Sequence, residues 1–129
     1  MNVAKEPIFS NHAPTPSGGY CQGIRAGKFV YLSGQGPGTT AGDTVQLTFG
    51  QSVRQVFANL DSVARAAGLS LADAVKINVY IESMDNFDEM DRIYRELVPQ
   101  PWPARTTVQS GLGGIGIEVD AVLWSDQDG

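Results

Sequence analysis

Residues 49–81, FGQSVRQVFANLDSVARAAGLSLADAVKINVYI, contain two apolar patterns in succession. The second pattern is an alternation along residues 75–81, which is typical of a strand with one buried face. In the first pattern, apolar residues recur at steps of three and four, the spacing of one helix face: Phe49, Val53, Val56, Phe57, Leu60, Val63, Ala64 and Ala67. The stretch therefore predicts a long amphipathic helix followed by a strand whose apolar side chains are Val75, Ile77, Val79 and Ile81.

The ends of the predicted helix carry start and stop signals. Asp43 or Thr44 can cap its first turn, and Gly68 can take the left-handed conformation that commonly follows a helix. Gly50 lowers the stability of the helix by about 1 kcal/mol relative to alanine, which the buried stripe outweighs. Ser70–Asp73 then predicts a short capped turn before the strand.

The flanking segments add a hairpin and a second helix. Tyr20–Ile24 and Lys28–Ser33 predict two short strands, and the glycines and proline that follow Ser33 are expected to end the second one. A second helix is expected to begin near Asp85 or Asn86 and to stop at Pro99. Its apolar face is Phe87, Met90, Tyr94 and Leu97.

Two more strands, Ala104–Gln109 and Ile115–Trp124, complete the pattern. The resulting order β-β-α-β-α-β-β predicts an α+β sandwich in which two helices cover one face of a mixed sheet. Residues 1–129 are expected to form a single domain, with residues 1–18 as an irregular arm that contains three prolines.

The face of the sheet opposite the helices is expected to mix large apolar groups with carboxylates. On the last strand the alternation directs one set of side chains towards the helices: Ile115, Ile117, Val119, Ala121 and Leu123. The opposite set is Glu118, Asp120, Val122 and Trp124, joined by Asn78 and Tyr80 of the earlier strand. Such a face is poorly suited to water, so we expect other subunits to cover it and to create a site between chains.

Composition excludes several classes of function. Nine Lys and Arg against 14 Asp and Glu give a net charge of -5, which argues against a nucleic-acid partner. The single cysteine, Cys21, excludes an internal disulfide and suits a reducing compartment. The sequence shows neither a signal peptide nor an apolar run of about 20 residues. We therefore expect a cytoplasmic protein with no membrane partner.

Arg105 and Glu118 are the strongest candidates for chemistry. A guanidinium can hold a small carboxylic acid by two parallel hydrogen bonds, and a carboxylate can orient or deprotonate water. The two residues stand on strands that are consecutive in the sequence. Together they suggest hydrolysis of a small acidic metabolite, and the alternative is that they form an ion pair at a subunit interface.

The chain resembles the RidA (YjgF) family of reactive-intermediate deaminases over nearly its whole length. The resemblance rests on short motifs in a specific order: Tyr20-Cys21-Gln22-Gly23, Leu32-Ser33-Gly34-Gln35, Asn59-Leu60 with Ala66-Ala67-Gly68, Val75-Lys76, Asn86-Phe87 with Tyr94, Pro103-Ala104-Arg105, and Ile117-Glu118-Val119-Asp120. It implies a chorismate-mutase-like subunit, a homotrimer, and hydrolysis of 2-imino acids or their enamine tautomers to 2-keto acids and ammonia.

The resemblance also implies roles for individual residues. Arg105 would hold the substrate carboxylate and Glu118 would orient the attacking water. The cleft between subunits would be lined by Tyr20, Ser33 and the backbone of Gly34 and Thr107. A protonated imine is already electrophilic, so this chemistry requires no cofactor and no metal.

Two positions depart from the pattern of the active deaminases. Thr107 stands where the family usually has cysteine, which is tolerable if only its backbone contacts the substrate. Asp91 stands where asparagine is usual, and its charge is expected to repel an anionic substrate unless it is protonated or turned away. The alternatives are therefore a larger enamine substrate such as an aminomuconate, or a non-catalytic module that binds small carboxylates or acts like a chaperone. A ribonuclease fits the acidic composition poorly.

Three other features predict no chemistry. Gly111–Gly116 matches G-x-G-x-x-G, but a strand rather than a helix is expected to follow, so we interpret it as a hairpin loop. Cys21 and His12 are the only residues of their kinds, too few for a zinc site. Trp102 is expected to be a packing residue, with a place in the wall of the cleft as the alternative.

Overall fold

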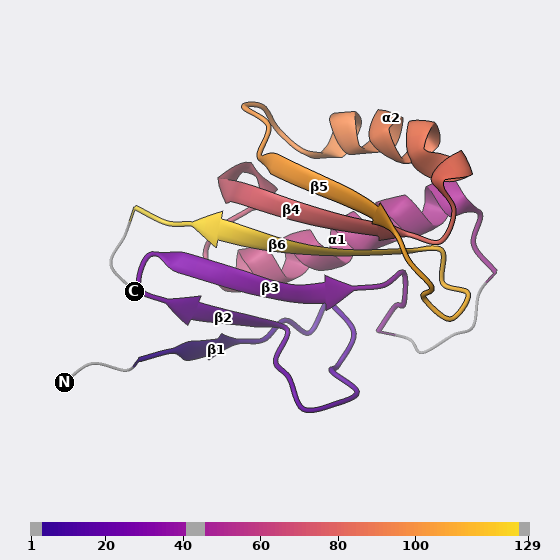
Figure 1. Cartoon of the computed structure of the whole chain (residues 1–129). Helices are drawn as coiled ribbons and strands as arrows, with labels where there is room; N and C mark the ends of the chain where they lie inside the picture. Colours follow the sequence, from indigo (N-terminus) through magenta and orange to yellow (C-terminus); the bar gives the residue numbers. More distant parts are fainter. Residues whose placement is uncertain (1–3, 41–45, 127–129) are drawn as a thin grey trace.

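The computed structural model describes residues 4–40 and 46–126, which share one six-stranded sheet (Figure 1). The strands follow the order β1-β2-β3-β6-β4-β5, and only β4 and β5 run parallel. Their bounds are β1 Glu6–Ile8, β2 Gly23–Ala26, β3 Phe29–Gln35, β4 Ala74–Ile81, β5 Ala104–Gln109 and β6 Ile117–Trp124.

Two α-helices, α1 (Phe49–Ala66) and α2 (Phe87–Leu97), cover one face of this sheet (Figure 1). Short 3-10 turns precede β4 and α2, at Leu71–Asp73 and Met84–Asn86. The predicted α+β architecture, a mixed sheet with two helices on one face, is confirmed.

The N-terminal arm differs from the prediction because it contains β1, which pairs with β2 at the edge of the sheet. The arm is held by the buried side chain of Gln22. Its Oε1 accepts from the Ser10 amide at 2.6 Å, and its Nε2 donates to the carbonyls of Ser10, Ala13 and Pro14. A three-residue strand that includes Pro7 carries no periodic signal, so the sequence did not indicate it.

The start of α1 lies at Thr48, not at the predicted caps. The Thr48 hydroxyl accepts from the Gln51 amide at 3.1 Å, and the Gln51 side chain accepts from the Thr48 amide at 2.9 Å. Asp43 and Thr44 lie outside the described residues. The predicted stop is confirmed, since Gly68 has a φ of 79° directly after the last turn. The predicted capped turn at Ser70 is also confirmed.

Several strand details differ because the sheet contains irregularities. The register shifts between Ala74 and Lys76, which buries Ala74 and leaves Val75 44% exposed instead of in the core. A second shift lets β3 continue through Ser33 and Gly34 to Gln35, where we expected it to end. β6 begins at Ile117, so Ile115 lies before the strand and is 38% exposed.

The two faces of the sheet have the compositions predicted for β6. Ile117, Val119, Ala121 and Leu123 are buried under the helices. The open face carries three exposed aromatic side chains and a carboxylate network. Asp120 accepts from Asn78 Nδ2 at 2.8 Å and from the Tyr80 hydroxyl at 3.0 Å, and the second bond raises the pKa of Tyr80. The aromatic residues are Phe29, Tyr31 and Trp124.

Candidate functional site

Arg105 lies on β5 and points to the helix side of the sheet. In the register of β5 with β4 it stands beside Ile77, a core residue. Its Nη1 donates to Asp91 Oδ1 of α2 at 2.8 Å, and both side chains are 22% exposed. The guanidinium carbon lies 4.6 Å from the centroid of the Tyr94 ring and 5.5 Å from that of Phe87. The cation is therefore fixed between an anion and two aromatic rings.

Asp91 is shared between two arginines. Its Oδ2 accepts from Arg95 Nε, one helical turn further along α2, at 3.0 Å. The hydrogen bond from Arg105 holds the pKa of the Asp91 carboxyl below its usual value; burial partly opposes this, and the bond from Arg95 adds to it. Asp91 is thus paired with two cations that favour its ionised form, which offsets its charge. The expected repulsion of an anionic substrate stays a prediction.

A hollow with a cavity volume of about 280 Å³ opens beside these groups. Arg95 forms one wall, its guanidinium carbon lying 5.4 Å from the centroid of the Trp102 ring. Trp102 therefore lines the hollow as well as packing. Arg105 also lines this hollow, and within the described residues only its Nη1 donates a hydrogen bond. Nε and Nη2 are the pair of donors that could bind a carboxylate in a bidentate manner. The lining residues are Asp91, Tyr94, Arg95, Trp102, Pro103 and Arg105.

Thr107 lies two residues along β5, on the same side as Arg105. Its hydroxyl is buried and has no hydrogen-bond partner in the described part of the chain. The Ser110 amide donates to the Ile81 carbonyl, and backbone groups alternate along a strand. The amide and carbonyl of Thr107 therefore face outwards from β5, which is an edge strand. A backbone role for Thr107 is compatible with this arrangement.

Glu118, Gly34 and Ser33 lie in another part of the sheet, and Tyr20 lies in the chain segment that contacts Ser33. Glu118 stands on the open face of β6, and a Cβ at Gly34 would collide with its carboxylate, so the backbone of β3 approaches Glu118 closely. Ser33 Oγ donates to the Cys21 carbonyl at 2.6 Å, which places Ser33 next to the segment of Tyr20. The Tyr20 side chain is 51% exposed.

The expected site residues therefore form two separate groups within one chain. We call Asp91, Arg105 and Thr107 the arginine half-site, and Tyr20, Ser33, Gly34 and Glu118 the glutamate half-site. The two lie on opposite faces of the sheet, and β4 separates β5 from β6. Arg105 is paired with Asp91 and not with Glu118. The strands of Arg105 and Glu118 are consecutive in sequence but are not neighbours in space.

Sequence reasoning missed two contacts of the site, that of Arg95 with Asp91 and that of Phe87 with Arg105. The spacing of Asp91 and Arg95, four residues apart on a helix, was the available signal for one of these contacts. Nothing in the spacing of Phe87 and Arg105 indicated the other.

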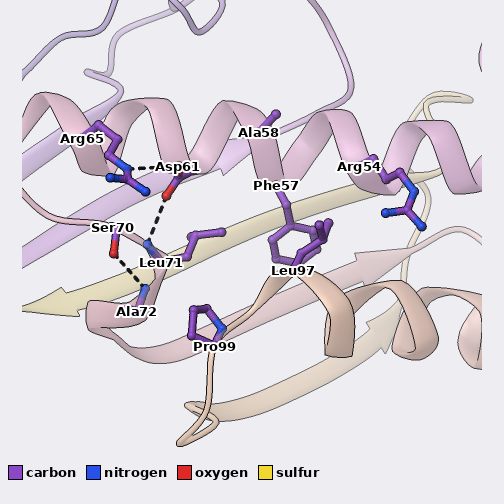
Figure 2. A pocket seen from close by; sticks show the side chains of 10 residues that line it. All are labelled: Arg54, Phe57, Ala58, Asp61, Arg65, Ser70, Leu71, Ala72, Leu97 and Pro99. Carbon is purple, nitrogen blue, oxygen red and sulfur yellow. Dashed lines mark hydrogen bonds and ion pairs between the residues drawn. The ribbon is translucent and has the colours of Figure 1, made fainter.

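A second hollow, of about 270 Å³, lies between α1, the turn at Leu71 and the end of α2 (Figure 2). Its floor is apolar, and its cations already have partners. Arg54 binds Glu96 at 2.6 Å and Arg65 binds Asp61 at 3.2 Å. None of the expected site residues lines it, and the apolar floor consists of Phe57, Leu71, Leu97 and Pro99.

The glycine-rich loop before β6 already holds an anion, the carboxylate of Glu82. Its two oxygens accept from the amides of Gly116 at 2.7 Å, Gly114 at 3.2 Å and Leu112 at 3.3 Å. As predicted, a strand and not a helix follows this loop. Three amides of the loop are thus bonded to a side chain of the same chain, which supports a structural role for the loop.

The same hydrogen bonds predict an acid-sensitive loop. They lower the pKa of Glu82 from its ordinary value of 4.5, led by the Gly116 amide. The folded-state pKa is depressed, so this stabilisation is present above the unfolded pKa and is lost as pH falls through the folded pKa. We expect Glu82→Gln to accelerate hydrogen exchange of the Gly114 and Gly116 amides by about tenfold at neutral pH.

The matched control for this loop is Asp85→Asn, which removes the same charge from an exposed position three residues on. Unchanged exchange in Glu82→Gln, or equal acceleration in both variants, would contradict the role of Glu82.

Within the described residues, no group of three His, Cys, Asp or Glu side chains is placed to hold a metal ion. His12 is exposed in the arm and Cys21 is half-buried. Residues 4–40 and 46–126 also include no helix long and apolar enough to cross a membrane.

The chain is similar to known proteins over most of its length. The family model described as endoribonuclease L-PSP matches residues 10–123. The 2-iminobutanoate/2-iminopropanoate deaminase of Dermatophagoides farinae is 35% identical over 105 residues, which covers 81% of this chain and 82% of that protein.

Solved structures agree with the sequence comparison. RidA from the Antarctic bacterium Psychrobacter sp. PAMC 21119 superposes with a TM-score of 0.87 at 31% identity, over 92% of this chain and 98% of that one. TdcF of E. coli, crystallised with bound serine, gives 0.88 at 26% identity over 94% and 99%.

The protein is thus a small α+β protein whose mixed sheet has both helices on one face. The two half-sites lie on opposite faces of that sheet. The matched family model covers most of the chain, and the named relatives align over 82% to 99% of their own lengths. The chain belongs to the RidA (YjgF) family.

Proposed function

We propose that this protein hydrolyses small 2-imino acids, or their enamine tautomers, to 2-keto acids and ammonia. The observation that carries the proposal is the state of Arg105. Its Nη1 donates to Asp91, its Nε and Nη2 have no hydrogen-bond partner within the described residues, and its side chain lines a hollow together with Tyr94 and Trp102. Such a fork holds a carboxylate in a fixed orientation. The activity named for the relative from Dermatophagoides farinae is consistent with this arrangement.

The chemistry that follows is the addition of water to a carbon–nitrogen double bond. Arg105 binds the substrate carboxylate, and Glu118 takes a proton from water as its oxygen attacks C2 of the protonated imine. The electron pair of the double bond moves to nitrogen. Glu118 returns this proton to the nitrogen. The C–N bond then breaks as the hydroxyl oxygen forms the C=O bond of the 2-keto acid and gives its proton to Glu118, which passes it to the departing ammonia. The step needs no cofactor and no metal.

We further propose that the two half-sites meet between subunits of a homotrimer. Arg105 and Glu118 cannot reach each other within one chain, because they lie on opposite faces with β4 between their strands. The open face carries Phe29, Tyr31 and Trp124, and covering these side chains would remove apolar area from water. Tyr20, Ser33, Gly34 and Thr107 would then line the same cleft. A cytoplasmic location is part of this proposal.

The decay of 2-iminopropanoate and 2-iminobutanoate, generated in situ and trapped with semicarbazide, tests the activity. We expect the folded protein to accelerate their conversion, and heat-denatured protein to have no effect. Absence of acceleration would contradict the deaminase proposal. Binding of a 2-keto acid without turnover would then favour a carboxylate-binding module, and salt-sensitive RNA binding would favour a ribonuclease.

A further inference from the structure

We propose that Asp91 sets the charge of the arginine half-site and thereby restricts the site to substrates that carry one negative charge. This inference rests on the proposed function, because it concerns the carboxylate that Arg105 would bind. It makes Asp91 the residue that favours imino acids with one carboxylate and an uncharged side chain over those with a second carboxylate.

The argument begins with the charges that line the hollow. Two guanidiniums, of Arg105 and Arg95, face one carboxylate, that of Asp91, which bonds to both at 2.8 and 3.0 Å. The three side chains together carry one net positive charge. A single substrate carboxylate on the free edge of Arg105 balances this charge, and a second carboxylate in the same hollow would be in excess.

The position of Asp91 makes this balance local to the site. It contacts Arg105 directly, and its side chain is only 22% exposed, so solvent screens it less than a surface carboxylate. Repulsion by Asp91 would weaken the binding of a ligand whose second carboxylate lies about 6 Å from it by about tenfold. This holds for an effective dielectric constant between that of water and that of a protein surface. In the proposed trimer, the negative charge of Glu118 would also weaken the binding of a ligand with a second carboxylate.

A purely structural role for Asp91 makes a different prediction. Ion pairs four residues apart on a helix contribute about 0.3–0.5 kcal/mol to stability. If Asp91 only stabilised α2 through its ion pair with Arg95, its replacement would change stability and leave the preference between ligands unaltered. The readout that separates the two roles is therefore a selectivity ratio and not an overall activity.

The experiment compares two keto acids, which are the products of the proposed reaction and do not require turnover. Binding of 2-oxobutanoate, with one carboxylate, and 2-oxoglutarate, with two, is measured by calorimetry at low ionic strength. We expect the wild-type protein to prefer 2-oxobutanoate by about tenfold or more. Asp91→Asn keeps an oxygen that can accept from Arg105, and it should reduce this preference to about twofold or less.

Two further variants complete the design. Asp88→Asn removes the same charge from an exposed position on α2 that has no hydrogen bond or ion pair within the described residues, and it should keep the wild-type ratio. Arg95→Gln removes a positive charge from the hollow and should increase the preference for 2-oxobutanoate. Because this change is opposite in sign to that of Asp91→Asn, loss of fold in one variant does not remove the test.

An unchanged ratio in Asp91→Asn, an equal change in Asp88→Asn, or a wild-type protein that binds neither keto acid would overturn the inference. The outcomes are separable from those of the imine assay. A wild-type protein that shows the expected selectivity but does not accelerate imine decay would retain the inference about Asp91 and refute the proposed catalysis.

Discussion

Replacing Arg105 by alanine is expected to lower kcat/KM for 2-iminobutanoate by about a hundredfold or more, with the fold retained. The variant loses two charge-assisted hydrogen bonds to the substrate carboxylate, each contributing about 1.5–3 kcal/mol, and about 1.4 kcal/mol corresponds to a factor of ten. The fold should persist because Asp91 keeps its second partner, Arg95. Kinetics with the trapped imine and thermal unfolding of the same sample measure both effects.

Arg92→Ala is the matched control for this substitution. Arg92 is an exposed residue of α2 whose ion pair with Glu96 spans 4.0 Å, and it does not line the hollow. Its removal changes the net charge equally and should leave turnover close to wild type. Comparable turnover in Arg105→Ala would show that the carboxylate is held elsewhere.

Glu118→Gln is expected to lower kcat by about 10²- to 10⁴-fold, the usual contribution of a positioned acid or base. Glutamine preserves the size of the side chain but cannot accept the proton of water. Asp120→Asn is the control on the same face of β6, because Asp120 already accepts from Asn78 and Tyr80. The rate constant for imine hydrolysis should fall much less in this control. If the rate constant fell equally in both variants, removal of any carboxylate from this face of β6 would explain the loss, and Glu118 would have no specific role.

Much of the fold was predictable because its long elements have strong periodicity. The stripe from Phe49 to Ala67 and the alternation from Ile77 to Ile81 correspond to α1 and β4. The exposure of Val75 and the continuation of β3 through Gly34 were not predictable. Both arise from register shifts against β6, a strand distant in sequence. A shift of this kind depends on the partner strand and leaves no local pattern.

The site was predictable only in part, for a related reason. The sequence singled out Arg105 and Glu118 by their chemistry, and alternation gave the face on which Glu118 lies. It could not show that β4 stands between β5 and β6. Nor could it show that Asp91 and Arg105, 14 residues apart, would form an ion pair. Asp91 therefore appeared in the sequence as a repelling charge, and it is a paired one in the structure.

The central claim is that each site combines Arg105 of one subunit with Glu118 of another, and mixing two inactive variants tests it most directly. Arg105→Ala and Glu118→Gln are unfolded together in equal amounts, refolded, and assayed for decay of 2-iminobutanoate. In every hybrid trimer one of the three interfaces receives both intact residues, so random assembly should restore roughly a quarter of the wild-type activity. If the mixed trimers form but remain as inactive as either parent, the two half-sites do not combine across subunits.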